Sequence, residues 1–89
     1  MSNHAQLLEA VTLAQAGDWD AAHHIAQDYS DHTANWIHAV LHKVEGDVWN
    51  SKYWYAKTGG RQYEDYAADM PRELEAIKQL LLSIDAASK

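Results

Sequence analysis

Two short stretches, Ala16-Gly17-Asp18-Trp19 and Glu45-Gly46-Asp47-Val48, decide how this chain is expected to fold. Glycine is common just past the end of a helix, and aspartate is a favourable cap for the first turn of the next one. The two Gly-Asp pairs lie 29 residues apart, and each joins two segments of similar length with helical periodicity. Because short connections make helices antiparallel neighbours, we expect two helical hairpins, over about residues 3–30 and 32–58.

Helical periodicity resumes beyond the second hairpin. Gly59-Gly60 ends the fourth helical segment, and residues 59–70 are expected to form a loop, with either irregular chain or a short turn of helix over 61–69. Proline is tolerated in a first helical turn, so a last helix is predicted over about 71–86. We therefore expect one all-α domain over 1–89 with about five helices. It consists of two antiparallel hairpins and a C-terminal capping helix, which we expect to pack beside the fourth helix.

The pattern of helix, Gly-Asp and helix resembles tetratricopeptide-like repeats, in which a Gly-x-aromatic turn precedes small residues and a further aromatic. The matching positions are Gly17, Trp19, Ala22 and Ala26 in the first copy and Gly46, Tyr53 and Ala56 in the second. The period is shorter than the usual ~34 residues. The runs Trp36–Asp47 and Tyr53–Tyr55 also resemble a family of small, uncharacterised bacterial proteins, over about residues 17–60. That resemblance implies an all-helical fold and a bacterial source, and it brings no activity with it.

Composition excludes several classes of function. The net charge is −6, and residues 1–42 contain five acids, all six histidines and no lysine or arginine. Because an acidic protein repels phosphate, we expect no nucleic-acid binding. The chain has no cysteine, no Gly-x-Ser-x-Gly nucleophile elbow and no phosphate-binding glycine loop, so an enzymatic role is not favoured. The start lacks the features of a signal peptide and no apolar run could span a bilayer. A cytoplasmic location away from the membrane is therefore expected.

A histidine-rich constellation is the sharpest candidate for chemistry. His38, His42 and Glu45 are spaced i, i+4, i+7, so they share one side of the third helix, beside its apolar stripe. Two imidazoles one turn apart can bind a divalent metal such as zinc, and a carboxylate can complete three ligands. His23 could approach from across the hairpin. The alternative is that these groups hydrogen-bond to neighbouring acids or tyrosines without any cofactor.

The second constellation is aromatic. Trp49 and Tyr53 share one face of the fourth helix, whereas Trp54 and Tyr55 point elsewhere. Internal packing, an interface with another chain and a ligand groove each remain open for the group Trp49, Tyr53, Trp54 and Tyr55, since tryptophan and tyrosine serve all three. The first hypothesis for function is a non-enzymatic protein-interaction module or a self-associating protein. The second is a metal-binding site at His38, His42 and Glu45.

Overall fold

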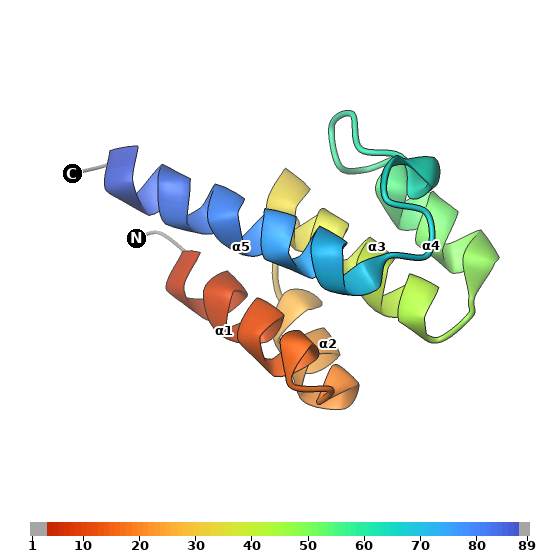
Figure 1. The fold of residues 1–89 in the computed structure, drawn as a ribbon, viewed down its shortest axis with the longest axis horizontal. Helices are drawn as coiled ribbons and strands as arrows, with labels where there is room; N and C mark the ends of the chain where they lie inside the picture. The colour runs from red at the N-terminus through yellow and green to blue at the C-terminus, as the bar shows by residue number, and fades with distance from the viewer. Residues whose placement is uncertain (1–3, 88–89) are drawn as a thin grey trace.

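The structure, a computed structural model, describes residues 4–87 and is all-helical over that range (Figure 1). Residue 3, where the first hairpin is expected to begin, lies outside the described residues. The elements are α1 (His4–Gln15), α2 (Trp19–Ala26), α3 (His32–Val44), α4 (Val48–Tyr55), a 3-10 turn η1 (Tyr63–Asp65) and α5 (Met70–Ala87). None of the helices described is both long and apolar enough to cross a bilayer.

The two Gly-Asp turns have the same backbone geometry. Gly17 and Gly46 have φ of 88° and 79°, in the left-handed region that favours glycine. The amide of the following aspartate donates to a carbonyl in the last turn of the preceding helix, at 2.9 Å for Asp18 and 3.0 Å for Asp47. Each aspartate side chain then accepts a hydrogen bond from the first turn of the next helix. A glycine with positive φ, an amide hydrogen bond back to the preceding helix and an aspartate cap on the next helix therefore form both chain reversals.

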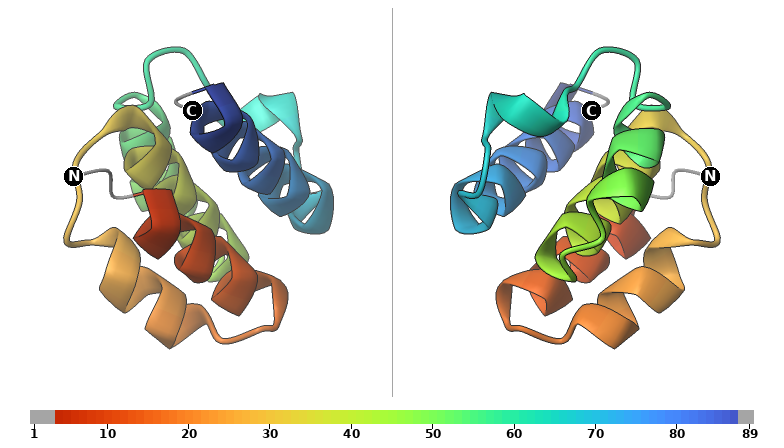
Figure 2. Two further views of the ribbon diagram at one scale, coloured as in Figure 1. Left: turned by 90° about the vertical axis from the view of Figure 1, so that its left-hand side faces the viewer. Right: turned by 90° about the vertical axis from the view of Figure 1, so that its right-hand side faces the viewer.

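Helix α3 is the centre of the domain. Nine of its 13 residues are buried, because α2, α4 and α5 all pack against it. Helix α1 pairs with α2, α3 pairs with α4, and α5 runs along α1 and α3 (Figures 1 and 2). The apolar core lies between these helices and includes Leu7, Val11, Ile37, Leu41, Leu74, Ile77 and Leu81.

The placement of α5 differs from the expectation that the last helix packs beside the fourth. Its backbone lies along α1 and α3, and Tyr55 of α4 reaches it through a side-chain hydrogen bond to Glu73. The physical reason is length. An 18-residue helix with a continuous apolar face buries more surface along two longer helices than along the eight residues of α4. The outer face of α4 is consequently left open.

Candidate metal centre

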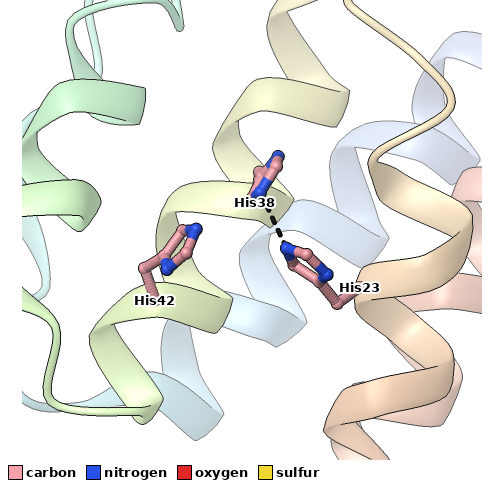
Figure 3. A group of neighbouring side chains, drawn as sticks. All are labelled: His23, His38 and His42. Carbon is pink, nitrogen blue, oxygen red and sulfur yellow. Dashed lines mark hydrogen bonds between the residues drawn. The ribbon is translucent and has the colours of Figure 1, made fainter.

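Three histidines from two helices meet where the hairpins join. His38 and His42 lie one turn apart on α3, and His23 reaches them from α2, which packs against α3 (Figure 3). One ring nitrogen from each lies within 4.8 Å of the other two. In the described part of the chain, these three histidines are the group of potential metal ligands whose ligand atoms lie close enough together to share one ion. We call it the histidine cluster.

Direct contact joins two members of the histidine cluster. The Nε2 atoms of His23 and His38 are 2.9 Å apart, so one ring donates a hydrogen bond to the other, and the ring planes meet edge to face. The rings of His38 and His42 are stacked, with centroids 5.0 Å apart and planes at 12°. Two stacked rings do not aim their nitrogens at one point, so at least one must turn to share an ion.

Packing restrains His38 more than His42. The His38 ring is stacked on Trp54, with centroids 4.0 Å apart, and the residue is 7% exposed. The His42 side chain is 17% exposed. Rotation of an imidazole about its last torsion is soft when neighbours permit it. His42 is therefore the less tightly packed of the two rings and the one that can turn more easily.

The other nitrogen of His42 faces two carboxylates. Its Nδ1 atom is buried and makes no hydrogen bond within the described part of the chain. Glu45 Oε1 is 3.6 Å away and Asp47 Oδ2 is 3.8 Å away, both beyond hydrogen-bond distance. Glu45, expected from its spacing to be a third ligand, thus lies behind His42 and outside the histidine cluster. Asp47 joins it there, held by a 2.6 Å hydrogen bond from the Asn50 side chain.

The electrostatics of the site favour an uncharged His38 beside ionised carboxylates. Burial, followed by repulsion from His23 and His42, lowers the pKa of His38 to about 4. Its imidazole is therefore uncharged near neutral pH, which is the form that binds metals. The hydrogen bonds from Asn50 hold the pKa of Asp47 below its usual range. A pocket of about 230 Å³, lined by Trp19, Asp20, His23, His42 and Glu45, adjoins the cluster.

The four aromatic residues of α4 divide between surface and interior. Trp49 is 75% exposed and Tyr53 is 48% exposed, and their rings are stacked. Trp54 is half-buried against His38. Tyr55 is only 3% exposed and belongs to the core, so it cannot contact another chain without unfolding.

Sequence reasoning missed a buried polar network on the other side of α3. The Glu73 carboxylate, fully buried, accepts hydrogen bonds from Trp36, Tyr55 and Lys43 at 2.8, 2.5 and 2.8 Å. Lys43 also donates to the Tyr63 carbonyl. The sequence does contain one indication of this network. Trp36, Val40 and Lys43 are spaced i, i+4, i+7, so the lysine lies on the same face of α3 as two apolar residues.

No family model, curated protein or solved structure matches this chain.

Proposed function

We propose that this protein binds one divalent transition-metal ion through His23, His38 and His42. The observation that carries the proposal is the convergence of three imidazoles from two helices, with ligand atoms within 4.8 Å of one another. Helical spacing alone explains two of them. The third comes from another helix, so the cluster depends on the tertiary fold.

The distances support an ion after a small adjustment. Zinc bonds to imidazole nitrogen at ~2.0–2.1 Å, so two nitrogens of a tetrahedral site lie about 3.3 Å apart. The His23 and His38 nitrogens, 2.9 Å apart, need to separate by a few tenths of an ångström. His42 must turn towards them. Its Nδ1–H would then remain on the side of Glu45 and Asp47, as metal-bound histidines commonly pair with an outer carboxylate.

The donor set selects the class of metal. Neutral imidazoles suit zinc, nickel, copper and cobalt, whereas magnesium and calcium prefer oxygen ligands. The chain supplies three nitrogens, which leaves a fourth tetrahedral position. His23 and His42 line the adjoining pocket together with Asp20 and Glu45, so an ion there would face that pocket. The negative charge of these acids favours a cation at this place.

The scaffold fits a helical-repeat protein. We take the two hairpins to be a tetratricopeptide-like pair, because the Gly-Asp turns repeat both the local sequence and the backbone geometry. A bacterial source and a cytoplasmic location are proposed from the sequence alone. An ion at the cluster would link α2 of the first hairpin to α3 of the second. We assign no catalytic residue.

Metal titration of protein made without an affinity tag tests the proposal. Zinc chloride added to chelator-treated protein should bind at one equivalent by calorimetry. At a free concentration a hundred times the dissociation constant, binding should add about 2.7 kcal/mol to the free energy of unfolding. For a domain of this size the melting temperature should rise by about 10–20 °C. Cobalt(II) should give the visible absorption of a tetrahedral site.

Variants separate a metal site from a purely structural hydrogen-bonded cluster. His42→Ala should lose the stoichiometric zinc and the gain in melting temperature. His24→Ala is the matched control, because His24 is exposed on the same helix as His23 and lies outside the cluster. It should bind zinc as the parent does. Less than about a tenth of an equivalent bound by the parent, or equal loss in both variants, would refute the proposal.

A further inference from the structure

The outer surfaces at α2 and α4 occupy equivalent places in the two hairpins but differ in chemistry: the first is acidic, and the second is aromatic with one lysine. Each helix has eight residues and begins directly after a Gly-Asp turn. Shifting the sequence by the 29-residue period pairs Asp20 with Trp49, His24 with Tyr53 and Asp28 with Lys57, and the last pair lies two residues past the end of each helix. All six are exposed. We call Asp20, His24 and Asp28 the acidic stripe and Trp49, Tyr53 and Lys57 the aromatic stripe.

The three side chains of the aromatic stripe contact one another. Trp49 and Tyr53 are stacked with centroids 6.1 Å apart, and the Lys57 ammonium lies 5.0 Å from the centre of the Tyr53 ring. Trp49 keeps 75% of its surface exposed and Val48, beside it, 44%. Exposed tryptophan and tyrosine with a neighbouring cation are typical anchors of protein interfaces, because they bury much area and lose little side-chain freedom.

The acidic stripe offers complementary charge. It belongs to the half of the chain, residues 1–42, that has five acids and no lysine or arginine. The side chains of Glu9, Asp18, Asp20 and Asp28 are all exposed in this half. Within the described residues, α2 packs on α1 and α3 and has no contact with α4, so the two stripes cannot satisfy each other inside one molecule.

We propose that the aromatic stripe of one molecule docks on the acidic stripe of a second copy, head to tail. Lys57 would pair with the carboxylates, while Trp49 and Tyr53 would supply the buried area. The patch is small and two molecules of net charge −6 repel each other, so association should be weak. The two stripes differ, so the contact is asymmetric and can continue from one copy to the next.

Sedimentation equilibrium over a range up to millimolar protein, with EDTA present to exclude metal bridging, tests this proposal independently of the metal site. The parent should self-associate. Lys57→Glu and Asp28→Lys should each weaken self-association by about tenfold or more, because each places like charges across the contact. An equimolar mixture of the two variants should associate again, since the mixed contact restores opposite charges.

Glu9→Lys is the matched control, because it changes the net charge as Asp28→Lys does but lies outside the acidic stripe. Both reduce the overall negative charge, which by itself favours association. Loss in Asp28→Lys alone therefore identifies the stripe. A parent that stays monomeric throughout would overturn the proposal. So would an Asp28→Lys variant that associates like the parent, because that result indicates a symmetric contact between two α4 helices.

Discussion

Replacing Glu73 by glutamine should destabilise the protein severely, because it leaves a buried ammonium without its counter-ion. Glu73 is fully buried, and the Lys43 side chain, 2.8 Å away, is 2% exposed. Glutamine keeps the shape of the side chain but loses the charge. It also places an amide N–H₂ group among donors from Trp36, Tyr55 and Lys43. Burial and the contact with Glu73 raise the pKa of Tyr55, so its phenol remains a donor.

The magnitude follows from what remains buried. Removing one partner of a buried ion pair costs about 3–5 kcal/mol. A domain of this length has a free energy of unfolding of about 4–13 kcal/mol. Glu73→Gln should therefore remove a large share of the stability. For a domain of this size that loss lowers the melting temperature by about 12–40 °C.

Urea unfolding followed by far-ultraviolet circular dichroism measures the effect, and a double-mutant cycle identifies its cause. Lys43→Met in the Glu73→Gln background removes the stranded ammonium and should recover about 1–3 kcal/mol relative to additivity. A single-variant loss below about 1 kcal/mol would refute the reasoning. Strict additivity of the two substitutions would refute it too, because it would show that Lys43 and Glu73 do not share one interaction.

Three further outcomes are expected. Because the pKa of His38 is about 4 in the folded protein and 6.5 otherwise, the unfolded chain binds more protons between these values. The stability of the metal-free protein should then fall by about 2 kcal/mol from pH 7 to pH 5, and this slope should flatten in His38→Gln. Trp49→Ser should change the unfolding midpoint little, by less than about 0.5 kcal/mol, since the side chain is 75% exposed; a larger loss would place it in the core. Gly46→Ala should lower the free energy of unfolding in urea by about 1 kcal/mol, because φ is 79° and alanine is strained there even though an added Cβ would meet no other atom. An unchanged midpoint would show that alanine is not strained at this position.

Part of the candidate site was predictable because it is local. His38 and His42 face one side of α3 by helical spacing alone, and His23 was predicted as a group that could approach them. The same local reasoning placed Glu45 with them. In the structure its carboxylate lies 3.6 Å from Nδ1 of His42 and outside the histidine cluster, because helical spacing places Glu45 near His42 but does not decide which ring nitrogen it faces.

The sequence by itself determined the helices and the two turns, since Gly-Asp pairs act through backbone conformation and capping within a few residues. Tertiary structure decided what each face meets. It buried Tyr55 and the Glu73–Lys43 pair, laid α5 along α1 and α3, and left Trp49 exposed. These outcomes depend on how long apolar faces combine across the whole chain. Helical periodicity states which residues share a face, but it does not state which other helix will cover that face.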